Sequence, residues 1–316
     1  MARVQKFKVA DPKNPTFSEK TRMLQGQLQR SLKAQDFKFT AFVAAARSED
    51  YNHTMNPIPP GFTMQDGELD IEKLRNLINQ VPKLSQLHKI LEEQQFSQIN
   101  RDIINLVFWV ILYAQNIHQI SVEEFMSKLP LTDENRCDRK PAHVFRVVAR
   151  RQPWFNEIVA THNIRTSTGI YCSKFEGIFK LLVHEFKIMN SEYLLLRTDF
   201  DPAFSLSERV WENSEFFTEF RCVAVCSILE HNEKVEKYIL NNAYSYLKIF
   251  DENLLLLNYL VLYEDETKAI KGEDPEQSWW KSKSHAILLG VLALLGVLVA
   301  VKATRSIRTG EPKFNY

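Results

Sequence analysis

Glycine is scarce in this chain, with nine glycines in 316 residues, less than half the share of about 7% that is usual in proteins. Backbones that approach a phosphate or a nicotinamide ring commonly use glycine, because a residue without a Cβ leaves room for the ligand. Between residues 141 and 265 the sequence has only Gly169 and Gly177, and it lacks the glycine motifs of dinucleotide-binding folds, P-loops and nucleophile elbows. The sequence therefore argues against the enzyme classes that depend on these motifs.

The chain also lacks an excess of one charge, since it has 40 basic and 39 acidic residues. Proteins that bind nucleic acid through its phosphates usually carry a basic excess, so we expect no nucleic-acid partner. The first residues contain scattered charges and no apolar run of the kind found in secretory signals, which predicts a cytosolic bulk of the chain. In the cytosol, disulfides rarely persist, and we expect the four cysteines to be free thiols (Cys137, Cys172, Cys222 and Cys226).

No metal site is expected from the cysteine and histidine spacing. Cys222 and Cys226 share one face of a predicted strand at a separation of about 13 Å, which is too far for one zinc ion. His184 and Glu185 lack the second histidine of a zinc-protease motif. We therefore expect Cys222 and Cys226 to be core residues.

One long apolar run lies near the C-terminus, where residues 286–301 contain no charged and no hydrogen-bonding side chain. A helix of this length spans about 24 Å, shorter than a hydrocarbon core of about 30 Å. Flanking tryptophans and lysines lengthen the segment that suits a bilayer, because their side chains favour the interface. These residues are Trp279, Trp280, Lys281, Lys283 and Lys302. We therefore predict one transmembrane tail anchor over residues 281–302.

Periodicity predicts a helical domain over residues 18–130, after a polar tail at residues 1–17. Ser18 is the expected cap of the first helix, which we expect to reach residue 33. Further helices are expected at 37–51, 71–78, 81–94 and 121–129. Residues 102–115 are apolar nearly all round but too short to cross a membrane, so they predict a central core helix.

The hydrophobic period changes to two after a polar linker, and residues 140–265 predict an α+β domain with its own sheet core. Strands are expected at 143–150, 166–173, 192–199, 220–229, 237–242 and 252–265, and helices at 175–186 and 204–211. Residues 266–280 form a polar linker to the predicted anchor, and residues 303–316 a short tail.

Several stretches, in this order, carry a resemblance to a known family: residues 42–62, 71–87, 105–112, 222–231 and 258–263, then Ser-Trp-Trp at 278–280 and the apolar run. The chain resembles a divergent member of the PARP family, and within that family the tail-anchored mono-ADP-ribosyltransferases of the endoplasmic reticulum. The resemblance implies an α+β fold, in which a helical domain packs on an ADP-ribosyltransferase domain with a mixed or antiparallel sheet. One C-terminal transmembrane helix follows, and NAD+ is the implied substrate.

The positions that this family uses for catalysis carry other residues here. Where the family's first strand ends in His-Gly-Ser, this chain has Tyr171, Cys172 and Ser173. The family's histidine holds the adenine ribose and its glycine backbone clamps the nicotinamide amide. A cysteine adds a Cβ where that amide should lie, and a tyrosine is bulkier than a histidine. Both substitutions are therefore expected to reshape the pocket.

Two further family positions are also substituted. The tyrosine that stacks on nicotinamide corresponds to Leu195, and Tyr193, two residues earlier on the same side of the predicted strand, is an alternative for that role. The position of the glutamate in chain-elongating members falls at Asn258 or Tyr259. The catalytic residues stay unassigned, and the candidate NAD+ pocket comprises Tyr171, Cys172, Ser173, Tyr193 and Tyr259. The alternative is that these tyrosines are ordinary residues of the sheet core.

Two functions follow from the resemblance. The first is a degenerate ADP-ribosyltransferase domain, weak or inactive, that acts as a membrane-held scaffold or sensor. The second is an active mono-ADP-ribosyltransferase that modifies itself or membrane-proximal proteins. The endoplasmic reticulum is the expected membrane by resemblance. The mitochondrial outer membrane is the alternative, because basic residues follow the short apolar run.

Overall fold

The computed structural model describes residues 15–129, 140–172, 174–188, 193–198, 210–217, 220–230, 233–240 and 244–264. These residues belong to one compact unit, Met1–Glu264, and show an α+β fold in which helices precede most of the strands. Within the described ranges, no helix is both long enough and apolar enough to span a bilayer. The predicted anchor, its linker and the tail at 303–316 lie outside these ranges, as does most of the helix expected at 204–211.

The first part of the chain is helical, as the periodicity predicts. Its elements are α1 (Phe17–Arg30), α2 (Leu32–Arg47), α3 (Tyr51–Thr54), α4 (Ile71–Ile78), α5 (Leu84–Glu92), η1 (Phe96–Gln98) and α6 (Arg101–Tyr113).

The prediction of Ser18 as the first cap is wrong. The hydroxyl of Thr16 accepts from the backbone N–H of Glu19, whose side chain in turn accepts from the backbone N–H of Thr16. This reciprocal capping box starts the helix at Phe17. The helix also ends before residue 33, because Ser31 caps the next helix.

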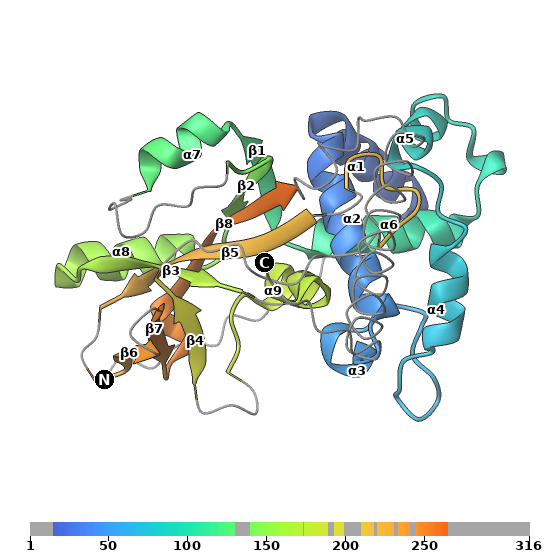
Figure 1. The fold of residues 1–316 in the computed structure, drawn as a ribbon. Helices are drawn as coiled ribbons and strands as arrows, with labels where there is room; N and C mark the ends of the chain where they lie inside the picture. Colours follow the sequence, from blue (N-terminus) through green and yellow to red (C-terminus); the bar gives the residue numbers. More distant parts are fainter. Residues whose placement is uncertain are drawn as a thin grey trace, which may run out of the picture. The chain divides into compact units, whose positions relative to one another are not determined.

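Helix α2 is the centre of the helical part. All of its residues from Ala34 to Ala46 are buried, and it contacts α1, α3, α4, α5 and α6. It also contacts three later elements, β1 (Asn116–Ile120), η3 (Phe175–Gly177) and α9 (Ile178–His184). Figure 1 shows α2 among these helices. Helix α6 is also almost fully buried, which confirms the predicted central core helix.

The strands form one eight-stranded antiparallel sheet in the order β1-β2-β8-β5-β3-β4-β7-β6. Their bounds are β1 (Asn116–Ile120), β2 (His143–Val148), β3 (Thr166–Tyr171), β4 (Leu194–Arg197), β5 (Phe220–Leu229), β6 (Val235–Leu240), β7 (Tyr244–Ile249) and β8 (Leu255–Glu264). The intervening helices are α7 (Val122–Lys128), α8 (Gln152–His162), η3 (Phe175–Gly177), α9 (Ile178–His184) and η4 (Glu252–Leu254).

Three of these elements are absent from the expectations: β1, α8 and β7. Strand β1 lies within the segment assigned to the helical domain, yet it pairs with β2 at the sheet edge. Only Ile117 of its five residues is buried, so its sequence has no clear alternation of period two. Residues 116–120 form a strand because they pair with β2, which begins more than twenty residues later in the chain.

Two cores lie on opposite faces of the sheet. The larger core joins the sheet to α2 and α9, and the ring of Phe37 stacks on that of Phe145 at 5.0 Å between centroids and also contacts Phe175, Phe217 and Phe220. The smaller core on the other face packs Phe125 of α7 against aliphatic residues of four strands (Val144, Ile170, Val223, Val225 and Val261).

Candidate functional site

The residues that the resemblance assigns to the family's catalytic positions, Tyr171, Leu195 and Tyr259, lie on three strands, β3, β4 and β8. In register, Tyr171 of β3 pairs with Ala224 of β5, and Tyr259 of β8 pairs with the next residue, Val225. Successive residues of a strand point to opposite faces. Tyr171 therefore packs on the larger core, whereas Tyr259 packs on the smaller one. The structure does not bring the two rings together.

Tyr171 is held by aromatic packing at the end of β3. Its half-buried ring meets that of Phe186 edge to face, with 5.4 Å between centroids. Cys172 follows on the opposite side and packs against the smaller core. Ser173 lies outside the described residues.

Strand β4 carries the position expected to stack on nicotinamide. Leu196 is part of the larger core, so Leu195 faces the other side, where 42% of it is exposed. Cys172, Leu195 and Tyr259 thus share the face of the smaller core, whereas Tyr171 is turned away from it. The alternative residue, Tyr193, precedes β4, and the ammonium of Lys248 lies 5.1 Å from its ring centroid.

The one glycine in β3 serves packing. A Cβ on Gly169 would lie 2.6 Å from Cδ1 of Ile228 and 3.4 Å from Cβ of Leu196. Both neighbours are fully buried, so the missing side chain lets adjacent strands pack closely. The carbonyl of Gly169 also accepts from the thiol of Cys226 at 3.2 Å.

The buried cysteines have little nucleophilic character. Cys222 and Cys226 are both residues of the larger core, as predicted. Burial raises the pKa of both thiols above the ordinary value, and a protonated thiol is a poor nucleophile.

A polar cavity of about 310 Å³ lies on the sheet face that carries Tyr259. Strands β2, β3, β5 and β8, the end of α7 and the start of α8 supply its walls. The lining residues are Lys128, Leu129, Arg146, Val147, Gln152, Thr166, Ser167, Thr168, Val225, Ser227, Asn258 and Tyr259. This cavity is not predicted from the sequence, although the Thr-Ser-Thr start of the strand expected at 166–173 is a visible signal of it.

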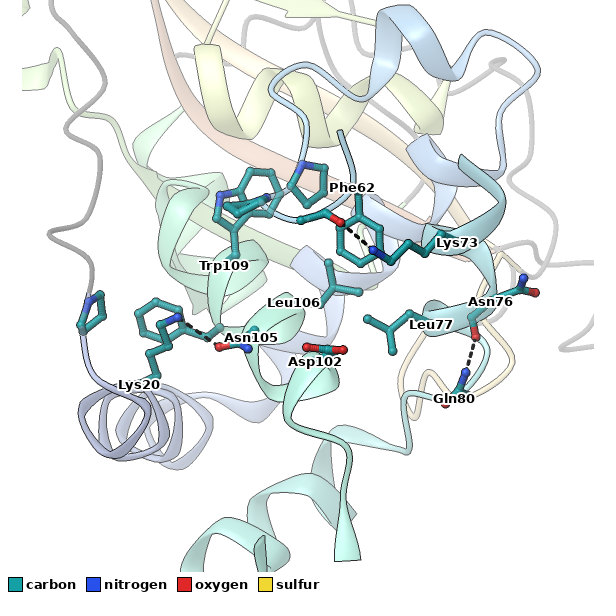
Figure 2. A pocket seen from close by; sticks show the side chains of 15 residues that line it. Lys20, Phe62, Lys73, Asn76, Leu77, Gln80, Asp102, Asn105, Leu106 and Trp109 are labelled. Carbon is teal, nitrogen blue, oxygen red and sulfur yellow. Dashed lines mark hydrogen bonds between the residues drawn. The ribbon is translucent and has the colours of Figure 1, made fainter. Parts of the chain in front are cut away.

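A larger cavity of about 1040 Å³ lies among the helices and is shown in Figure 2. Lys20 and Lys73 stand on opposite sides, with Leu77 and Leu106 between them and Trp109 above. The ammonium of Lys20 donates to Oδ1 of Asn105 at 3.1 Å, and that of Lys73 donates to the carbonyl of Gly61 at 3.0 Å.

Each of these ammonium groups also lies near an aromatic ring, Lys20 at 5.8 Å from Phe108 and Lys73 at 5.5 Å from Phe62. Asp102 is the one carboxylate among the described lining residues. The cavity therefore has a cation on each side, with Leu77, Leu106 and the carboxylate of Asp102 between them.

The helices that form this cavity have a recognisable family signature. Residues 26–111 match the family model of the ARTD15 N-terminal domain. The ARTD15 match runs from within α1 through most of α6 and includes every lining residue of the larger cavity except Pro15 and Lys20. ARTD15 is a PARP-family member, so the match supports the relation to the PARP family that the sequence motifs indicate. No curated protein matches the chain.

The ARTD15 match ends before the sheet begins. The residues of the candidate NAD+ pocket, from Tyr171 to Tyr259, therefore lie outside it. Their roles depend on the resemblance and on the packing described above.

Proposed function

We propose that this protein is an ADP-ribosyltransferase-fold relative of the PARP family with weak or no transferase activity, and that it acts as a scaffold or sensor at a membrane. One observation carries the proposal: the ring at the family's histidine position, Tyr171, packs on Phe186 on the sheet face opposite to Tyr259. The match of residues 26–111 to the ARTD15 N-terminal domain supports the family relation.

The chemistry of ADP-ribose transfer explains why this packing matters. Positive charge develops on the ribose as the nicotinamide bond breaks, and the enzyme must hold NAD+ in a bent geometry to exploit this. Tyr171 is engaged with Phe186 and faces away from the other family positions. Leu195 offers an apolar surface but no π face for the nicotinamide ring. These substitutions favour a degenerate transferase.

The second candidate is an active mono-ADP-ribosyltransferase with substituted pocket residues. Cys172, Leu195 and Tyr259 share one sheet face, which supports this candidate because a ligand could contact all three. Under this alternative NAD+ is the substrate, and the protein itself or membrane-proximal proteins are the acceptors.

Incubation of the full-length chain with labelled NAD+ distinguishes the two functions. We expect no automodification and no NAD+-dependent shift in thermal unfolding. A ligand at a hundred times its Kd adds about 2.7 kcal/mol of stability, so binding would be visible. Automodification that is lost in Tyr171→Ala or Ser173→Ala, and kept in the exposed control Ser97→Ala, would overturn the scaffold proposal.

Membrane attachment is part of the same proposal. We propose that residues 281–302 anchor the protein in the endoplasmic reticulum with the folded part in the cytosol, and the mitochondrial outer membrane is the alternative. A glycosylation site added after Tyr316 should receive a glycan if the tail is lumenal. A glycan on Asn52, in the natural Asn-His-Thr sequence, would contradict this topology.

We propose that the larger cavity is where the scaffold binds a partner peptide with an apolar residue between acidic ones. The two lysines supply complementary charge on either side of Leu77 and Leu106, and the apolar part of the peptide would lie beside the carboxylate of Asp102. A fluorescein-labelled peptide, Glu-Asp-Leu-Phe-Asp-Glu, should bind the full-length chain. Its affinity should fall at least about tenfold in Lys20→Glu/Lys73→Glu, and a peptide with lysines for its acids should not bind. Equal binding by both proteins would refute this site.

A further inference from the structure

A strip of polar side chains crosses the sheet face that is otherwise covered by the smaller core. Near α7 this face is apolar, with Ile170 of β3 and Val225 of β5 buried against Phe125. Two and four residues back along β3, the same face carries Thr168 and Thr166. Neighbouring strands continue the strip, with Ser227 on β5, Tyr259 on β8 and Arg146 on β2. The polar residues of this strip all line the cavity of about 310 Å³.

An irregularity in the sheet helps to form this cavity. The β5–β8 register passes from Val225 opposite Tyr259 to Cys226 opposite Leu257, so Asn258 is an extra residue in β8. Such a bulge interrupts the ladder and redirects a side chain. The amide of Asn258 enters the cavity and donates to the hydroxyl of Ser227 at 2.5 Å.

Most of the other polar groups in the strip have no protein partner. Among the residues that the structure describes, the side chains of Thr166, Thr168 and Arg146 make no hydrogen bond to protein, and neither does the hydroxyl of Tyr259. Lys128 at the rim forms an ion pair with Glu124. Several free donors and acceptors that converge on one cavity, on central strands of a sheet, are typical of a ligand site.

The chemistry of the lining indicates the class of ligand. Hydroxyl and amide groups both donate and accept hydrogen bonds, which suits the hydroxyls of a sugar. Arg146 supplies the guanidinium fork that matches a phosphate, and no carboxylate occurs among the described lining residues. The ring of Tyr259 provides one partly apolar wall. A volume of about 310 Å³ lies at the lower end of ligand pockets, so the ligand is smaller than a dinucleotide.

We propose that this cavity binds a sugar phosphate, either as a free metabolite or as the terminal ribose phosphate of a larger molecule. Arg146 and Lys128 contact the phosphate, and Thr166, Thr168 and Ser227 contact the sugar hydroxyls. The site shares Tyr259 with the candidate NAD+ pocket, whereas Tyr171 and Cys172 do not line the cavity.

Calorimetric titration of the full-length chain with ribose 5-phosphate tests the proposal. We expect saturable binding that weakens at least about tenfold in Arg146→Gln and in Thr168→Val, since each loses hydrogen bonds to the ligand. The matched control Arg22→Gln removes an exposed charge of α1 and should bind like the natural protein. Unchanged circular dichroism and melting temperature establish that the variants are folded.

Titration with further ligands distinguishes a free sugar phosphate from the terminal ribose phosphate of a larger molecule. Tighter binding of ADP-ribose with the same sensitivity to Arg146→Gln would assign the site to a terminal ribose phosphate, whereas binding of ribose 5-phosphate alone would assign it to a free sugar phosphate. Either result supports the proposal. Absence of binding, equal binding by the variants, or inorganic phosphate binding as tightly as ribose 5-phosphate would overturn it. Incorporation of label from NAD+ into the protein is a separate measurement. A negative result with ribose 5-phosphate therefore does not decide the transferase test.

Discussion

The side chain of Lys38 is fully buried in α2, and its replacement by methionine is expected to change how protein stability depends on pH. Its ammonium nitrogen lies 3.0 Å from the carbonyl of Ile111 near the end of α6 and has 0% exposure. Burial lowers the pKa of Lys38 from 10.5 to about 7, and the nearby positive charge of Arg150 adds to this effect. The folded protein therefore disfavours the charged form.

The size of the effect follows from the two pKa values. Between about pH 7 and pH 10.5 the unfolded chain holds a proton on Lys38 that the folded protein has released. The free energy of unfolding therefore rises with pH, at about 1.4 kcal/mol per pH unit, or about 4 kcal/mol from pH 7 to pH 10. Lys38→Met removes this dependence, and it removes a hydrogen bond to Ile111 worth about 1 kcal/mol.

Urea unfolding followed by tryptophan fluorescence at pH 7, 8, 9 and 10 measures this difference. Lys38→Met should be more stable than the natural protein by about 3 kcal/mol at pH 7 and slightly less stable at pH 10. The exposed residue Lys89 of α5 gives a matched control, Lys89→Met, whose curve should follow the natural one. If the free energies of unfolding of Lys38→Met and the natural protein changed in parallel with pH, the reasoning would be refuted. Parallel curves would mean that burial does not shift the pKa of Lys38.

Three further predictions concern buried residues, and urea unfolding measures all of them. Burial raises the pKa of Asp36 from 3.8 to about 6, so the free energy of unfolding should fall by about 2 kcal/mol as the pH rises from 4 to 6; in Asp36→Asn this fall should disappear. Phe37→Ala should cost about 3 to 5 kcal/mol, because Phe37 joins helix α2 to four other rings in the larger core. Glu185→Gln should cost about 3 to 5 kcal/mol, because it leaves the guanidinium of Arg151, 2.8 Å away, without its buried anion.

Each of these has a clear contrary result. A fall between pH 4 and pH 6 that persists in Asp36→Asn would assign that dependence to other groups. A loss below about 1 kcal/mol in Phe37→Ala would mean that the larger core can collapse around the deletion. An equally small loss in Glu185→Gln would mean that solvent or another group compensates Arg151.

The sequence predicted the elements whose own residues carry a strong period. Helix α6 is apolar nearly all round, α4 buries Ile71, Leu74, Leu77 and Ile78 at helical spacing, and β5 and β8 are long apolar strands. In these segments the residues that are buried in the fold are the same apolar residues that form the local hydrophobic pattern. Strands β1 and β7 and helix α8 were missed because packing or pairing with distant segments stabilises them more than their own pattern does.

The class of fold and the apolar run at the C-terminus follow from the sequence alone, because each depends only on which residues are present and how they are spaced. The same holds for the residues found at the positions that the resemblance assigns to catalysis. The directions in which these side chains point depend on the tertiary structure. Sheet register turns Tyr171 away from Tyr259, and the bulge at Asn258 gathers Thr168, Ser227 and Arg146 from three strands into one cavity. Register and bulges arise from pairing between segments far apart in the chain, and a single segment does not specify that pairing.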